Sequence, residues 1–167
     1  MNNDSIWNPP KKRCMPTVED IVNAQELLAG TVRKTPLQTS KTFSGLAGTN
    51  LFLKLECLQV TGSFKVRGAF VKISRLSDEQ AAYGVIAASA GNHAQGVAYA
   101  ATIKKISCTI VMPENASPAK VAATRSYGAK VVRCGANYDD AWEATQEIAK
   151  VENRTIIHAF DDPDVIA

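Results

Sequence analysis

Residues 51–70 decide the fold, and they read Leu51-Phe52-Leu53-Lys54-Leu55-Glu56-Cys57-Leu58-Gln59-Val60-Thr61-Gly62-Ser63-Phe64-Lys65-Val66-Arg67-Gly68-Ala69-Phe70. In the first five residues leucines face one side and Phe52 and Lys54 the other, which predicts a β-strand. From Phe64 onward apolar residues recur at helical spacing, and Gly62-Ser63 is a suitable helix N-cap. We therefore expect a strand, a polar turn and a helix over residues 63–76.

Beyond this stretch, short apolar runs alternate with helical patterns. Strands are expected at residues 51–55, 84–88, 108–112, 130–133 and 155–159. Helices are expected at residues 63–76, 92–103 and 138–151, with another that starts at Ser117 and ends before Gly128. Such alternation indicates right-handed βαβ units. The fold class is therefore α/β, a three-layer αβα arrangement with a parallel, Rossmann-like sheet. A helix at 17–29, an extended stretch at 32–37 and a short helix at 40–47 precede it.

Lys65 falls in the first turn of its expected helix. The N-terminus of a helix carries partial positive charge, which makes a charged lysine unfavourable in the first turn. The alternative interpretation is an ordinary surface lysine exposed to solvent. The same field favours the neutral amine, so the position suits a nucleophile. The stretch Ser89–His93 also follows a strand, and ligands bind at that edge of an open α/β sheet. Taken alone, this stretch could equally be a tight turn capped by Asn92.

Composition excludes several classes of function. The chain has 167 residues, 46% of them hydrophobic, and a net charge of +3, enough for one domain with a real core. Its only basic cluster, Lys11-Lys12-Arg13, indicates a solvated tail and no nucleic-acid partner. No apolar run approaches the roughly 18 residues of a membrane span, and no signal peptide is recognisable. The four cysteines lack metal-ligand spacing, so we expect reduced thiols, no metal site and a cytoplasmic protein.

Three stretches carry a family resemblance. They are Thr61-Gly62-Ser63-Phe64-Lys65-Val66-Arg67-Gly68-Ala69, Ser89-Ala90-Gly91-Asn92-His93-Ala94-Gln95-Gly96, and Val111-Met112-Pro113-Glu114-Asn115-Ala116 with Lys120. In this order they resemble the signatures of the pyridoxal-phosphate enzymes of the tryptophan-synthase-β type (fold type II). Within that group they are similar to the branch of threonine and serine dehydratases and serine racemase. The resemblance runs from about Pro16 to Ala167.

The resemblance implies the cofactor pyridoxal 5'-phosphate and a role for each motif residue. Lys65 would carry the Schiff base to the cofactor and act as the base that removes the α-proton. Phe64 would pack near the cofactor ring, and Asn92 would bond its phenolic oxygen. The substrate carboxylate would be held by Ser89, Ala90, Gly91, Asn92 and His93. For His93, a role in buttressing the turn is expected slightly ahead of contact with substrate.

The activity implied is dehydration and deamination of L-threonine or L-serine to 2-oxobutanoate or pyruvate plus ammonia. This makes the expected protein a homo-oligomeric enzyme of amino-acid metabolism, including isoleucine biosynthesis, with a small amino acid as substrate. A serine racemase or β-replacement enzyme of the same cofactor class is one alternative. A non-catalytic interaction or regulatory module that retains the fold is another.

Two departures from the family pattern shape these expectations. Ala90 stands where racemases of the branch carry a proton-donating serine, which favours elimination over racemisation. The glycine-rich phosphate loop and the Ser or Cys at the pyridine nitrogen are not found after Phe160. We therefore expect an N-terminal part of a two-domain enzyme: a disordered tail (1–15), lead-in helices that belong with a larger domain (16–49), a complete smaller α/β domain (50–160), and the start of the larger domain (161–167).

Overall fold

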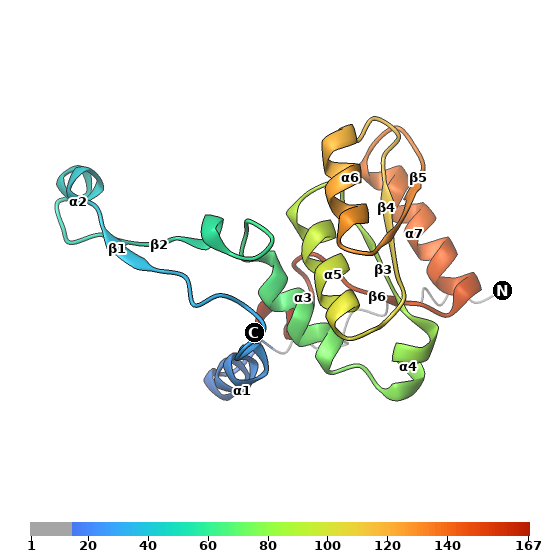
Figure 1. Ribbon diagram of the computed structural model, residues 1–167, viewed down its shortest axis with the longest axis horizontal. Coiled ribbons are helices and arrows are strands. Elements are labelled where there is room, and N and C mark those ends of the chain that lie inside the picture. Colours follow the sequence, from blue (N-terminus) through green and yellow to red (C-terminus); the bar gives the residue numbers. More distant parts are fainter. Residues whose placement is uncertain (1–14) are drawn as a thin grey trace.

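The computed structural model describes residues 15–167, and a parallel sheet of four strands lies at its centre (Figure 1). The strands are β3 (Val85–Ala88), β4 (Cys108–Met112), β5 (Lys130–Arg133) and β6 (Thr155–Ile156), in the order β5-β4-β3-β6. Val85 pairs with Cys108 on one side and with Thr155 on the other. The expected tail, Lys11-Lys12-Arg13 and Cys14 fall on residues 1–14, outside the described part of the chain.

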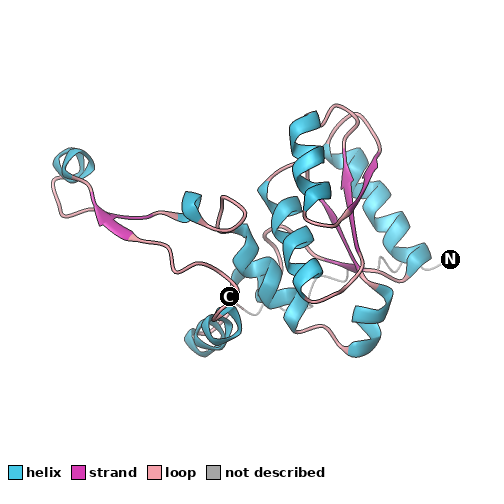
Figure 2. Cartoon of the chain, viewed as in Figure 1, coloured by secondary structure: helices cyan, strands magenta, loops and turns pink. Residues whose placement is uncertain are grey.

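Helices cover both faces of this sheet (Figure 2). One face is covered by α3 (Lys65–Ser74), α5 (Asn92–Ile103) and α6 (Pro118–Ser126), and the other by α7 (Tyr138–Glu152). The strands serve both layers because successive side chains point to opposite faces. Val85 and Ala87 pack with the first set of helices, whereas Ile86 packs with α7. The predicted three-layer αβα fold is confirmed.

The expectation that residues 51–55 begin the βαβ alternation is wrong. β2 (Phe52–Lys54) pairs antiparallel with β1 (Leu37–Thr39), and α2 (Lys41–Ala47) connects them. These elements form an arm, residues 36–55, that projects from the α/β body (Figure 1). Residues 51–55 carry a single polar side chain, Lys54, so their pattern does not distinguish a strand of this arm from a parallel strand buried on both faces.

Several element boundaries also differ from the sequence prediction. The expected helix 63–76 begins at Lys65 and ends at Ser74. The expected strand 155–159 ends at Ile156, although the Ile157 N–H still donates to the Ile86 carbonyl. A short helix, α4 (Asp78–Tyr83), was not expected, although Ser77 and Gln80 form a capping box at its start.

Two helices at the ends of the described chain pack on α3. α1 (Val18–Leu28) starts at the predicted capping box and buries Ala24 and Leu28, while Val18 is 78% exposed. α8 (Pro163–Ile166) lies against Gly68, where an added Cβ would collide with the Val165 carbonyl. Within residues 15–167, no helix is both long and apolar enough to cross a membrane.

Candidate active site

Lys65 is the first residue of α3, and a tight turn places it there. Gly62 has φ +73°, a conformation that glycine adopts without strain. The Ser63 hydroxyl accepts a hydrogen bond from the Lys65 N–H at 3.3 Å. Ser63 therefore accepts a hydrogen bond from an N–H at the start of the helix, as expected of an N-cap. The residue directly before the helix is Phe64, whose backbone is already helical. The expected N-cap is therefore displaced by one residue.

The side-chain amine of Lys65 lies at the carboxyl edge of the parallel sheet. Its Nζ donates a hydrogen bond to the Ala159 carbonyl at 2.7 Å, and the side chain is half-buried. Ala159 follows β6, which pairs with β3, the strand that leads into Ser89. The lysine and the Ser89–His93 turn therefore occupy the same edge, where α/β proteins bind ligands.

The Ser89–His93 turn presents backbone N–H groups at the start of α5. The Ser89 N–H donates to the Val111 carbonyl at 3.1 Å, and the Ser89 hydroxyl accepts from the Gly91 N–H at 3.1 Å. In the part of the chain that the structure describes, no side chain caps α5. The first N–H groups of a helix have no partner within it, so they are available to an anion such as a carboxylate. Asn92, the first helical residue, is exposed.

His93 points away from solvent and binds the chain after β6. The residue is 4% exposed, and its Nε2 donates to the Ile157 carbonyl at 2.9 Å. Burial lowers the pKa of this imidazole to about 4, and the nearby Lys65 charge acts in the same direction. The neutral ring therefore carries its proton on Nε2. This contact supports a role in holding the turn.

Gly96 is a site residue that the sequence reasoning missed. A Cβ at this position would lie 2.9 Å from Val66 N and 3.0 Å from Lys65 C, closer than side-chain carbons approach backbone. The missing side chain therefore lets α5 pack directly against the first turn of α3. Its position within the quoted motif, on the apolar side of the expected helix, was the signal available. Ala159 and His158 were also missed as neighbours of the lysine.

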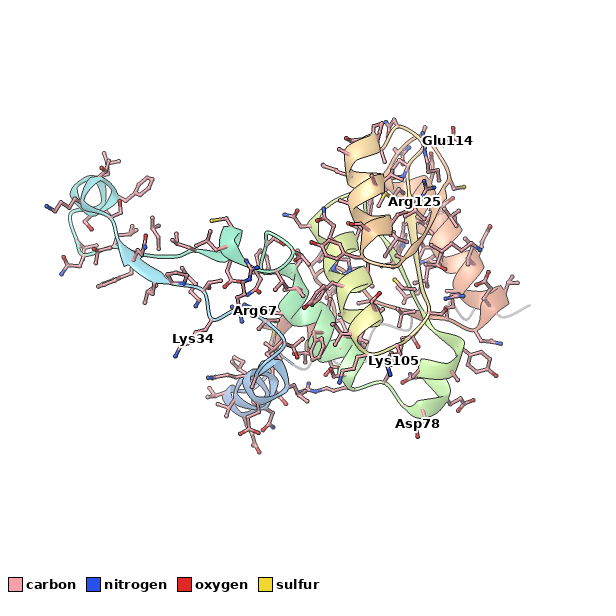
Figure 3. The ribbon with its side chains drawn as sticks, in the orientation of Figure 1. Lys34, Arg67, Asp78, Lys105, Glu114 and Arg125 are labelled. Atoms are coloured by element: carbon pink, nitrogen blue, oxygen red, sulfur yellow. The ribbon has the colours of Figure 1, made fainter. Side chains whose placement is uncertain are left out.

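An ion pair fixes the start of α3 to the base of the arm. Arg67 donates to both carboxylate oxygens of Glu56, at 2.7 and 2.9 Å, and the Thr35 hydroxyl donates to the same carboxylate at 2.5 Å. The Arg67 hydrogen bond is the main reason that the pKa of Glu56 falls to about 2. Figure 3 shows Arg67 where the arm meets the body.

Two exposed aromatic side chains lie near the Lys65 amine and the carbonyl that it binds. Phe64 is 57% exposed, and its ring centre lies 5.3 Å from the Lys65 Nζ. Phe160, next to the Ala159 carbonyl, is 67% exposed. Exposed aromatic rings beside a half-buried amine are suited to contact a flat ring.

The described residues include groups that suit an aldehyde cofactor. Within residues 15–167, no three His, Cys, Asp or Glu side chains are grouped as metal ligands. In the same range, Thr61 Oγ1 and His93 Nδ1 are buried polar atoms without a partner. Such atoms mark places where a ligand or water completes the hydrogen bonding. A lysine between this polar turn and an aromatic ring is a suitable point of attachment for an aldehyde.

Fold and site together define an α/β domain with a half-buried lysine amine at the carboxyl edge of its sheet. Residues 28–167 match the model of the family described as "Pyridoxal-phosphate dependent enzyme", and the chain belongs to that family. It is 49% identical over 153 residues to an L-threonine ammonia-lyase from Thermotoga maritima, a match that covers 92% of this chain.

Solved structures with a similar fold support this family assignment. A serine racemase from Dictyostelium discoideum superposes with a TM-score of 0.83 and 37% identity. A bacterial threonine deaminase, from the organism abbreviated T.th., superposes with a TM-score of 0.80 and 43% identity. Each match covers 90% of this chain but less than half of the other chain, 49% and 47% respectively. The chain likewise spans 38% of the Thermotoga maritima relative.

Proposed function

We propose that this chain is the lysine-bearing part of an L-threonine ammonia-lyase that also accepts L-serine. The products would be 2-oxobutanoate or pyruvate, together with ammonia. One observation carries the proposal: the Lys65 amine lies at the same carboxyl edge of the sheet as the Ser89–His93 turn. The relatives named L-threonine ammonia-lyase and threonine deaminase support this choice of reaction.

Each motif residue has a role in this proposal. Pyridoxal phosphate, when bound, supplies an aldehyde for the lysine and a ring that withdraws electrons from the substrate's α-carbon. Lys65 would be the point of attachment for that aldehyde, and its amine, once free again, would take up the α-proton as a base. Backbone and side-chain groups of Ser89, Ala90, Gly91, Asn92 and His93 would hold the substrate carboxylate. The Asn92 amide would bond the ring oxygen, and Phe64 would contact the ring. We assign no residue of this chain to the cofactor phosphate.

Racemisation is the second candidate, because serine racemases are among the structural neighbours. Epimerising an α-carbon needs a proton donor on the face opposite Lys65, and the methyl group of Ala90 cannot donate a proton. Residue 90 therefore supports elimination over racemisation.

The arm and α1 are proposed to belong with a second, larger domain, as residues 161–167 are. On the arm, Leu37 is 63%, Leu46 80% and Phe52 56% exposed, which is an unusual amount of apolar surface for a free hairpin. The chain also spans less than half of its relatives. The expected complete smaller domain was residues 50–160; because residues 50–55 belong to the arm, the unit proposed as complete is residues 56–160. We propose further that the enzyme is cytoplasmic and homo-oligomeric.

The test is product analysis with the polypeptide that carries this sequence. Incubation with L-threonine and pyridoxal phosphate should give 2-oxobutanoate, detected by its reduction with NADH and a dehydrogenase, and Lys65→Ala should abolish it. Incubation with L-serine should give pyruvate well in excess of D-serine. D-Serine as the main product would replace the proposal with racemisation, and no turnover of either amino acid would refute it.

A further inference from the structure

The segment after β6, residues 157–161, passes directly beside the lysine. Its Ala159 carbonyl accepts the hydrogen bond from Lys65 Nζ at 2.7 Å. Alanine has no side chain that could hold its own peptide group in one orientation, and Phe160 beside it is 67% exposed. Something else must therefore keep this carbonyl turned toward the amine.

His93 holds the segment on the near side of Ala159. Its Nε2–H donates to the Ile157 carbonyl at 2.9 Å, two residues before the carbonyl that binds Lys65. Because a carbonyl oxygen can only accept, the ring nitrogen must carry the proton. The contact joins α5 to a segment 64 residues further along the chain.

His158 holds the segment on the far side. Its Nδ1 accepts from the Asp161 N–H at 2.8 Å and from the Phe160 N–H at 3.3 Å. These bonds fold the backbone into a turn around the Ala159 carbonyl. The ring is itself fixed by edge-on contacts with Trp142 and Phe160, whose ring centres lie 5.4 and 4.7 Å away. In this contact Nδ1 must be without a proton.

From this arrangement we propose that His93 and His158 are positioning residues: they hold the Ala159 carbonyl toward Lys65 and thereby set the place of the reactive amine. His93 acts as a donor through Nε2, and His158 acts as an acceptor through Nδ1. The proposal deepens the proposed function, because the amine so placed is the one assigned to the cofactor. Neither histidine needs to contact cofactor or substrate to play this part.

The charges around the two rings favour this hydrogen-bonding pattern. Burial lowers the pKa of both rings, and the Lys65 charge lowers both further. Asp161 and Asp162 act in the opposite direction on His158, without outweighing burial. Both rings are therefore neutral at neutral pH, as the donor role of one and the acceptor role of the other require.

The two roles predict opposite responses to the same pair of substitutions. The glutamine amide nitrogen reaches the place of histidine Nε2, and the asparagine carbonyl oxygen reaches the place of Nδ1. His93→Gln should therefore keep its bond, and His93→Asn should lose it. His158→Asn should keep its bonds, and His158→Gln should lose them. An unspecific effect of polarity or size would rank Asn and Gln in the same order at both positions.

The experiment is competitive acetylation of the chain with trace acetic anhydride, followed by mass spectrometry. The readout is the rate at Lys65 relative to that at Lys150, an exposed lysine near the end of α7. His93→Asn and His158→Gln should raise this ratio about tenfold, the factor for losing one hydrogen bond worth about 1.4 kcal/mol. His93→Gln and His158→Asn should raise it much less. Thermal melting shows which variants are folded, and the His158 pair decides alone if the His93 variants are not.

The proposal would be overturned if Asn and Gln changed the Lys65-to-Lys150 acetylation ratio in the same order at both positions. It would also be overturned if this ratio were unchanged in all folded variants. Acetylation needs no cofactor, so the two proposals can fail separately. Pyridoxal phosphate could fail to react with Lys65 while the Asn and Gln variants still rank in opposite orders at positions 93 and 158. In that case the proposed function is refuted and the positioning role stands. If the adduct at Lys65 forms but Asn and Gln do not rank in opposite orders at the two positions, the positioning role is refuted and the proposed function stands.

Discussion

Gly96→Ala should displace Lys65 by pressing on the backbone at the start of α3. The new Cβ would lie 2.9 Å from Val66 N, 3.0 Å from Lys65 C and 3.1 Å from Lys65 O. Ordinary contacts of such a carbon start near 3.4 Å, so α3 and α5 must separate by a few tenths of an ångström. The neighbours are backbone atoms, which cannot rotate away as a side chain would.

Two opposing effects determine how much Gly96→Ala changes the unfolding free energy. Overpacking in a tight interface costs roughly 1–3 kcal/mol. Replacing glycine by alanine inside a helix gains about 1 kcal/mol. We therefore expect a net loss of about 1 kcal/mol for Gly96→Ala. Gly45→Ala is the matched control: Gly45 lies in α2, and an added Cβ there would meet nothing within 4 Å, so this variant should gain up to ~1 kcal/mol.

The assays are urea unfolding and the rate at which pyridoxal phosphate and borohydride form a pyridoxyl adduct at Lys65. A displacement of 1 Å at a reacting group can lower a rate about a hundredfold, so we expect roughly a tenfold loss in Gly96→Ala. Gly45→Ala should react at the wild-type rate. If Gly96→Ala proves as stable as Gly45→Ala and reacts as fast as wild type, the close packing of α5 does not position the lysine.

Three further outcomes are expected. His93 binds a proton at about pH 6.5 when unfolded but only near pH 4 when buried, so the unfolded chain holds more protons between these values. The unfolding free energy should therefore fall by up to ~3 kcal/mol as the pH drops through this window. The fall should be smaller in His93→Gln, and urea unfolding at pH 7 and pH 4.5 measures both. Arg67→Met and Glu56→Gln should each cost about 1 kcal/mol and together less than their sum, because they remove the same ion pair; additive losses in a double-mutant cycle would contradict this. Gly68→Ala should push α8 off α3, cost roughly 1–3 kcal/mol and speed proteolysis within residues 161–167, and unchanged digestion would show that α8 tolerates the methyl group.

The α/β body could be predicted because its signals are local. Val85–Ala88 is a continuous apolar run of strand length, and Cys108–Met112 is another with the single polar residue Thr109; the structure confirms both, the first with its start moved by one residue. Asn92–Ile103 was also predicted at its observed bounds, since it follows a strand and begins at a small-residue turn. Patterns of this kind depend on neighbours a few residues apart, which the sequence displays directly.

Pairing partners and long-range contacts could not be predicted in the same way. Residues 51–55 have the alternation of a strand, but nothing local shows that they pair with Leu37–Thr39 instead of the main sheet. The motif indicated Lys65 as the reactive lysine, yet its contact with Ala159 joins residues 94 positions apart. Gly96 reveals its role only when α3 is packed against it. The assignments of Phe64, Asn92 and the Ser89–His93 turn to ligand groups remain predictions.

The central claim is that the amine of Lys65 is the group that reacts with pyridoxal phosphate. The direct measurement is to treat the chain with limiting pyridoxal phosphate, reduce with borohydride and map the pyridoxyl group by peptide mass spectrometry, with the exposed Lys150 as internal comparison. The account predicts that Lys65 is modified first and that Lys65→Ala leaves only slow, scattered labelling. Labelling of Lys65 no faster than that of Lys150 would contradict it.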